Sequence, residues 1–243
     1  ADMERKQVGE GGVELLDNLR RHACQSLSAA GDALSALSRV LRDPPLETSP
    51  GGIGRDVIES ASAVRWLCDP ECGVEERIQR IGSIWLHDLD EMRKLLNVQD
   101  RKDSIKAKQA KVEDLNSTAE QIEKIRERLL QEGAAVKCWM GSTDLVKNAS
   151  DMEFEYRLWS NLSHGNPYAL QTIRDMHASG PTGILGASFH VMTFSVGAFS
   201  RALVAFAQYF SPGKVPKLKE RVSELYDRLG IAGSEQQRDF LQP

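Results

Sequence analysis

The sequence has few cysteines, the residues whose disulfides cross-link small or extracellular proteins. It contains only four cysteines among 243 residues, and 6% of it is aromatic. Four cysteines are too few for a disulfide framework in a chain of this length, so we expect reduced thiols and a cytoplasmic setting. Cys68 and Cys72 are the close pair, but no second Cys or His pair follows at the spacing of a zinc finger. We therefore expect no metal and no other cofactor.

The sequence also lacks an excess of charge of either sign. The 31 Lys and Arg residues against 35 Asp and Glu residues give a formal net charge of −4. This balance excludes nucleic-acid binding by bulk positive charge, so any contact with RNA must be local. No basic segment followed by an apolar run opens the sequence, and we expect no signal peptide.

Long apolar runs are rare as well. The least polar stretch, residues 183–200, is interrupted by glycines, serines and His190, and Arg201 follows it directly. A single membrane span is one interpretation of such a stretch. The interpretation we favour is a buried central helix whose small residues let neighbouring helices approach closely, without a membrane partner.

What the sequence does contain is helical periodicity. Apolar residues recur at spacings of three and four, and no segment shows the alternation of a strand. The spacings predict helices over residues 13–41, 55–68, 74–98, 151–164, 184–210 and 217–229, among others. The predicted fold is a single-domain, all-α bundle of seven or eight helices covering residues 1–243. We expect the 151–164 helix to pack centrally against the 184–210 helix, and the glycine-rich stretch up to Gly54 to be a loop.

The charged segment Lys102–Leu130 stands apart from the rest. Its apolar residues form a narrow seam, typical of a helix packed along one partner. We expect a long helix that projects from the bundle or mediates a homodimer. Two alternatives remain: the seam folds back on its own chain, or the chain splits into two domains in this region.

The candidate chemistry lies in residues 155–167. On a helix, Arg157, Asn161 and His164 fall within roughly 60° of one another. His164 directly precedes Gly165, which places its imidazole at the end of the helix, and this group can release and take up a proton near neutral pH. An apolar face is expected beside the polar triplet, formed by Phe154, Leu158 and Leu162.

The Arg157-x6-His164 element resembles the Arg-x(4–6)-His motif of the HEPN superfamily, the higher eukaryotes and prokaryotes nucleotide-binding domains. Leu158 stands where the family usually has a polar residue. Further ordered pieces resemble uncharacterised bacterial helical proteins within or near that superfamily: Arg55-x3-Glu59-x6-Trp66-Leu67-x-Asp69-Pro70, Glu76-Arg77-x2-Arg80 and Tyr156-Arg157-x2-Ser160-x3-His164-Gly165-x-Pro167.

The resemblance implies a helical bundle, often paired so that two Arg/His helices face each other across a cleft that cuts RNA without metal. His164 would then be the acid/base, Arg157 would bind the phosphate, and Asn161 would orient one of them. The residues implied to contact an RNA or nucleotide substrate are Tyr156, Ser160, Asn166, Arg55 and Glu59.

A different class of function fits the same residues. Arg157 would pair with Glu153 or Asp151, and His164 would cap its own helix. The chain would then be a non-catalytic helical protein that binds a nucleotide, a small ligand or a protein partner.

Overall fold

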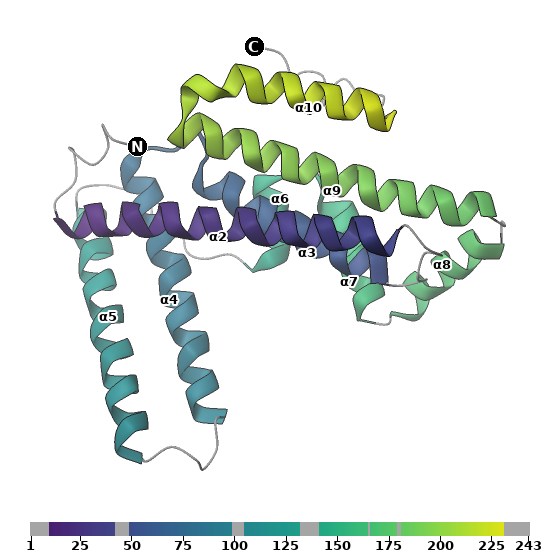
Figure 1. The fold of residues 1–243 in the computed structure, drawn as a ribbon. Helices are drawn as coiled ribbons and strands as arrows, with labels where there is room; N and C mark the ends of the chain where they lie inside the picture. Colours follow the sequence, from purple (N-terminus) through teal and green to yellow (C-terminus); the bar gives the residue numbers. More distant parts are fainter. Residues whose placement is uncertain are drawn as a thin grey trace. The chain divides into compact units, whose positions relative to one another are not determined.

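The computed structural model of the chain is helical throughout the part that it describes. That part comprises residues 10–41, 49–98, 105–131, 141–164, 166–178 and 181–230. Within these ranges every regular element is a helix and no strand occurs (Figure 1). The all-α fold predicted from the apolar spacing is therefore confirmed.

The chain divides into two compact units. One comprises Ala1–Arg21 and Glu71–Trp139, and the other comprises His22–Pro70 and Met140–Pro243. The helix α2 (Glu10–Val40) supplies residues to both. Each unit is described by itself below.

The first unit contains the charged segment. Helix α5 (Ile105–Gln131) packs against α4 (Val74–Val98). Residues 102–104 of the predicted helix lie outside the described residues. Along the seam of α5, Ile122 is buried while Val112 and Leu115 are half-buried. The seam thus has a partner helix within its own chain, which is the alternative that its spacing had left open.

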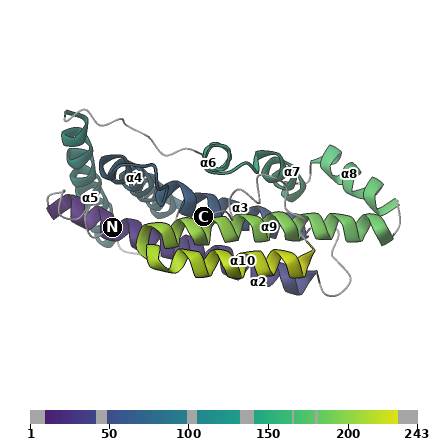
Figure 2. The same ribbon diagram turned by 90° about the horizontal axis from the view of Figure 1, so that it is seen from above.

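Helix α3 (Ser49–Leu67) is the centre of the second unit. It contacts α9 (Pro181–Phe210), α7 (Glu153–Ser163) and α6 (Ser142–Ala149). Figure 2 shows α3 between the row formed by α6 and α7 and the long helix α9. The sequence predicted that the helix now seen as α7 would pack centrally on α9. The structure instead gives the central position to α3, whose small residues allow close approach on two sides.

Glycine explains that close approach. A Cβ atom at Gly54 would lie 2.8 Å from a ring carbon of Trp159 and 2.8 Å from a methyl group of Val191. Both distances are far inside van der Waals contact, so only glycine fits where α3, α7 and α9 meet. The predicted loop up to Gly54 is wrong from Ser49 onward, because these glycines lie inside α3 and serve packing rather than chain reversal.

Helix α10 (Val215–Leu229) covers the other side of α9. Val222 and Tyr226 of α10 are buried together with Val196 of α9. Leu34 of α2 packs on the edge of this cluster. The helix ends at Gly230, whose φ of 62° is left-handed and suits glycine. The helix predicted for residues 217–229 thus ends at the same residue as α10.

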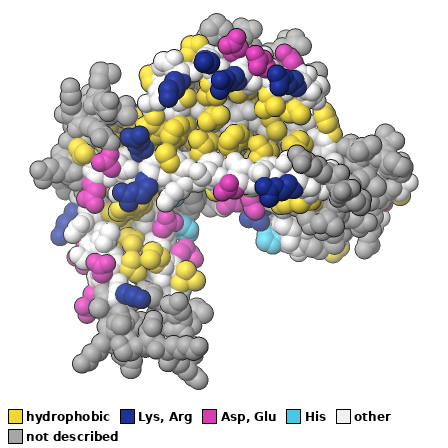
Figure 3. Space-filling view, viewed as in Figure 1, with side chains coloured by type: hydrophobic (Ala, Val, Ile, Leu, Met, Phe, Trp, Pro, Cys, Tyr) yellow, Lys and Arg dark blue, Asp and Glu magenta, His cyan; other side chains and the backbone are white. Residues whose placement is uncertain are grey.

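One described helix is long and apolar enough to span a membrane. It is the part of α9 from Ser188 to Phe210, and half of its most apolar window is buried in the structure. Figure 3 shows apolar side chains over α9 beside the charged side chains of α10. Core helices of water-soluble bundles share this length and composition, so the helix is weak evidence for a membrane span.

Two shorter elements complete the second unit. Helix α8 (Pro167–Ala178) contacts α7 and α9, and the 3-10 helix η1 (Pro212–Lys214) joins α9 to α10. Through α8, the chain passes from the end of α7 to the start of α9.

Candidate functional site

Helix α7 carries the residues that the motif singled out. It runs from Glu153 to Ser163, and His164 is its C-cap residue. Arg157, Asn161 and His164 are exposed, as expected for residues spaced by four and three on one side of a helix. Tyr156, Trp159 and Leu162 are buried. The helix therefore separates a polar exposed edge from a packed side.

The packed side is not quite the one that the sequence predicted. Phe154 was expected in the apolar face, but 70% of its surface is exposed. Trp159 is buried instead, with its ring against the backbone of α3 at Gly54. Burying the larger indole removes more apolar surface from water, and this sets the rotation of α7 about its axis.

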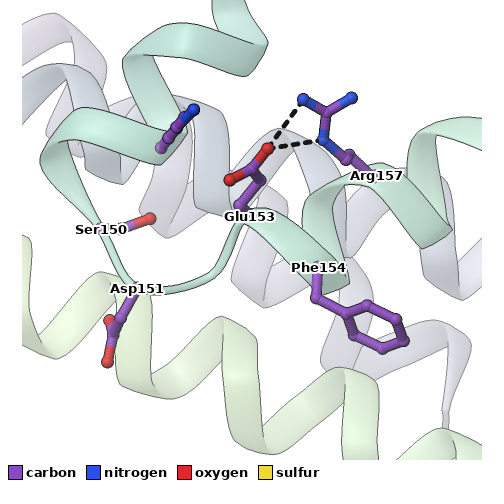
Figure 4. A pocket seen from close by; sticks show the side chains of 6 residues that line it. Ser150, Asp151, Glu153, Phe154 and Arg157 are labelled. Carbon is purple, nitrogen blue, oxygen red and sulfur yellow. Dashed lines mark hydrogen bonds and ion pairs between the residues drawn. The ribbon is translucent and has the colours of Figure 1, made fainter.

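Arg157 is directed toward the start of α7. Its Nε and Nη2 atoms both lie 2.7 Å from the same carboxylate oxygen of Glu153, one turn earlier (Figure 4). His164 lies seven residues further on, about 10.5 Å along the helix axis. The Arg157 guanidinium thus lies away from the end of the helix at which His164 is located.

Hydrogen bonds to backbone carbonyls hold the residues at the end of α7. The backbone carbonyl of Ser160 accepts the Ser163 hydroxyl at 2.8 Å and the His164 amide at 3.1 Å. The carbonyl of Asn161 accepts the Asn166 amide at 2.9 Å. These bonds satisfy carbonyls that a helix end leaves open, and they fix the backbone around His164.

A polar cluster on the packed side is centred on Glu59 of α3. Its carboxylate accepts the Tyr156 hydroxyl at 3.0 Å, the Ser142 hydroxyl, and Nη2 of Arg55 at 3.4 Å. The second Nη atom of Arg55 reaches the Ser163 hydroxyl at 3.5 Å. We call these five residues the Glu59 cluster. It joins α3 to the start of α6 and to both ends of α7.

The Glu59 cluster brings together three of the five predicted substrate-contacting residues, namely Arg55, Glu59 and Tyr156. Ser160 and Asn166 lie toward the end of α7 and make the backbone bonds described above. The guanidinium of Arg55 also lies over the Tyr156 ring, 5.5 Å from its centroid, in a cation–π arrangement.

The tyrosine of this cluster is a neutral donor. Burial raises the pKa of Tyr156, although Arg55 opposes the shift. The hydroxyl therefore keeps its proton at neutral pH and donates it to Glu59. The Glu59 carboxylate accepts hydrogen bonds from three side chains, which makes the Glu59 cluster a framework for α7 rather than an open reactive group.

A second anchor holds the corner between α6 and α7. The carboxylate of Asp151 bonds Arg201 of α9, whose side chain is only 8% exposed. Arg65 of α3 lies in the same electrostatic environment: burial lowers its pKa, and the charge of Arg201 lowers it further, whereas Asp151 opposes the shift. One half-exposed carboxylate thus ties the corner to Arg201 of α9 and lies near enough to influence Arg65 of α3 electrostatically.

An open hollow lies on the outer side of this corner. Its volume is about 490 Å³, and its lining comes from Lys147, Ser150, Asp151, Glu153, Phe154 and Arg157 (Figure 4). Lys147 lies in the last turn of α6, and Glu153, Phe154 and Arg157 belong to the first turns of α7. The hollow thus joins the exposed Phe154 to Arg157 of the motif.

The sequence pattern missed Ser142, Ser163, Asp151 and Arg201 as parts of these arrangements. Ser142 lies in the first turn of α6, after the N-cap residue Gly141, and its hydroxyl is bonded to Glu59. Glu59 and Ser142 are 83 residues apart, and Asp151 and Arg201 are 50 apart. No local spacing reports such pairs.

Metal ligands do not converge in the described residues. No group of three or more His, Cys, Asp or Glu side chains lies close enough there to hold a metal ion. Of the described cysteines, Cys68 and Cys72 are buried and Cys24 is exposed, and none of the three forms a disulfide.

The chain matches no protein-family model, no curated protein and no solved structure.

Proposed function

We propose that this protein is a HEPN-like, metal-independent ribonuclease that acts on single-stranded RNA along the exposed edge of α7. The observation that supports the proposal is the separation within this helix. Buried contacts of Tyr156 and Trp159 hold the helix in place, while Arg157 and His164 remain exposed on the other side. A firm helix that presents a cation and an imidazole is suited to a phosphodiester.

In the proposed reaction, the 2′-hydroxyl of the RNA attacks the adjacent phosphorus and the bond to the 5′-oxygen breaks. His164 as base takes the proton of the 2′-hydroxyl, and an acid gives a proton to the departing 5′-oxygen. Arg157 binds the phosphate oxygens, whose charge grows in the transition state. The products are a 2′,3′-cyclic phosphate and a 5′-hydroxyl, and Asn161 orients His164 or the phosphate.

Arg157 must leave Glu153 to meet a phosphate near His164. The ion pair is exposed, with 57% of the Arg157 side chain accessible, and exposed pairs of this kind contribute only about 0–1 kcal/mol. A phosphate dianion or a phosphodiester competes well for a guanidinium under those conditions. The observed pairing therefore does not oppose the proposed role.

The need for both a base and an acid gives a reason for a homodimer. One imidazole cannot be base and acid at the same moment, and a second α7 from another copy would bring the second imidazole. We place the protein in the cytoplasm because four cysteines are too few for a disulfide framework in a chain of this length.

Cleavage of labelled single-stranded RNA by the purified chain in EDTA tests the proposal. We expect a 2′,3′-cyclic phosphate at the new 3′ end, and a loss of about 100- to 10,000-fold in rate for His164→Ala. His22→Ala, which changes a histidine of α2, is the matched control and keeps the wild-type rate. If His164 only caps α7, its substitution costs about 0.5–2 kcal/mol of stability and wild-type protein cuts no RNA.

A second candidate function is RNA or nucleotide binding without cleavage. The Glu153–Arg157 pair favours it, because Arg157 is turned away from His164 in the structure. A binding protein would retain RNA on a filter or in an anisotropy assay while leaving it intact in EDTA. His164→Ala would then change affinity alone.

A further inference from the structure

The exposed ring of Phe154 needs an explanation of its own. Among the large apolar side chains that the structure describes, it has the greatest exposed fraction, 70%. It lies on the first turn of α7 and lines the hollow of about 490 Å³. A hollow of this size accepts a group as large as a nucleotide.

The charges around the ring indicate which chemistry the hollow accepts. Its two carboxylates are each engaged by an arginine: Asp151 by Arg201, and Glu153 by Arg157. Lys147 lines the same hollow and is exposed, and the structure shows no ion pair or hydrogen bond for its ammonium among the described residues. An aromatic face beside cations is the combination that binds the bases and phosphates of single-stranded nucleic acid.

The floor of the hollow is held in place by packed groups. Asp151 is tied to α9 through Arg201. Met152, the next residue, is buried, and its methyl group lies near Gly197 of the same helix, 3.4 Å from where a Cβ would stand. A site whose shape exists before the ligand arrives loses less conformational entropy on binding.

We infer that this hollow is a nucleotide subsite, in which one base of single-stranded RNA stacks on Phe154 and its adjoining phosphate binds Lys147, while Arg157 is left to the next phosphate toward His164. The inference rests on the proposed function and adds a substrate-positioning surface to it. Arg157 lies three residues after Phe154 and seven before His164. An RNA strand that runs along α7 therefore passes from the base stacked on Phe154 to the imidazole of His164.

Equilibrium binding of a fluorescein-labelled, 2′-O-methyl single-stranded RNA, followed by anisotropy in EDTA, tests the subsite separately from cleavage. Phe154→Ala is expected to weaken binding about 5- to 150-fold, the usual range for one stacked base. Phe154→Trp preserves the stacking face and keeps the affinity within about threefold of wild type. Phe189→Ala is the matched control, since Phe189 is 52% exposed on α9 and outside the hollow.

Lys147→Gln tests the phosphate side of the subsite. It is expected to weaken binding and to reduce the salt dependence by about one phosphate contact. Lys217→Gln, on the exposed side of α10, should leave both unchanged. Melting curves of all variants check that exposed substitutions keep the fold.

The outcomes separate the two proposals. If wild type binds the RNA and Phe154→Ala binds equally well, the subsite is wrong while the proposed function stands. If wild type neither binds nor cuts RNA, the proposed function is wrong and the subsite falls with it. Loss of binding in Phe154→Ala and Phe189→Ala alike would also overturn the subsite, because the effect would not depend on the hollow.

Discussion

The two sides of α7 differ in how many contacts their side chains make within the protein. Toward α3, Tyr156 donates to Glu59, and Trp159 fills the space left by Gly54. On the exposed side, Arg157 is paired with a single half-buried carboxylate, that of Glu153, and His164 is the C-cap residue of the helix. Packed, hydrogen-bonded side chains stabilise the fold, whereas exposed side chains are accessible to a ligand. The comparison predicts that stability and RNA binding divide between the two sides.

The largest effect on stability is expected from the packed side. Trp159→Ala should lower the free energy of unfolding by about 3–5 kcal/mol, because a buried indole is lost and a cavity remains. Asn161→Ala, an exposed change two residues later on the same helix, should stay within about 0.5 kcal/mol of wild type. Urea unfolding followed by circular dichroism measures both. Equal losses in the two variants would show that α7 is not divided as the structure has it.

Helical spacing predicted the class of fold but not which helix is central. Trp159 and Val191 lie far from Gly54 in the sequence, and only their meeting explains why glycine is required there. Read locally, the glycines before Arg55 favour a loop, because glycine weakens an isolated helix. Tertiary packing outweighs that preference, and α3 begins at Ser49.

The site was predictable to a similar extent. Periodicity placed Arg157 and His164 on one side of a helix, and the ordered resemblance drew attention to Glu59 with Tyr156. Periodicity alone could not decide between Phe154 and Trp159 as the buried aromatic, since that choice depends on the surface of α3 opposite them. Hydrogen bonds between distant elements, such as Ser142 to Glu59, depend on the whole fold.

A smaller effect is expected within the Glu59 cluster. Tyr156→Phe removes one hydrogen bond and should cost about 0.5–1.5 kcal/mol. Combined with Glu59→Gln, the two substitutions should be non-additive by about 0.5–3 kcal/mol, since the groups are bonded to each other.

The control for this pair is Tyr226→Phe with Glu59→Gln, because Tyr226 belongs to the separate buried cluster between α9 and α10. Urea midpoints of the four proteins in each cycle give the coupling free energies. Additive losses for Tyr156 and Glu59 would mean that their hydrogen bond contributes nothing to holding α7. The tyrosine would then be retained for packing alone.

The smallest change in stability is expected at the exposed ion pair, where the comparison is sharpest. Glu153→Gln removes the carboxylate that holds Arg157, and because the pair is exposed the free energy of unfolding should fall by only about 0–1 kcal/mol. The same change frees the guanidinium and removes a negative charge from the hollow, so affinity for single-stranded RNA should rise by up to about fivefold at low salt, and less at high salt. Glu155→Gln, also in the first turn of α7, controls for net charge. Weaker binding in Glu153→Gln than in this control would mean that Glu153 positions Arg157 for the phosphate instead of competing with the phosphate for Arg157. The side chains on the exposed side of α7 would then be held by internal contacts, as those on the packed side are.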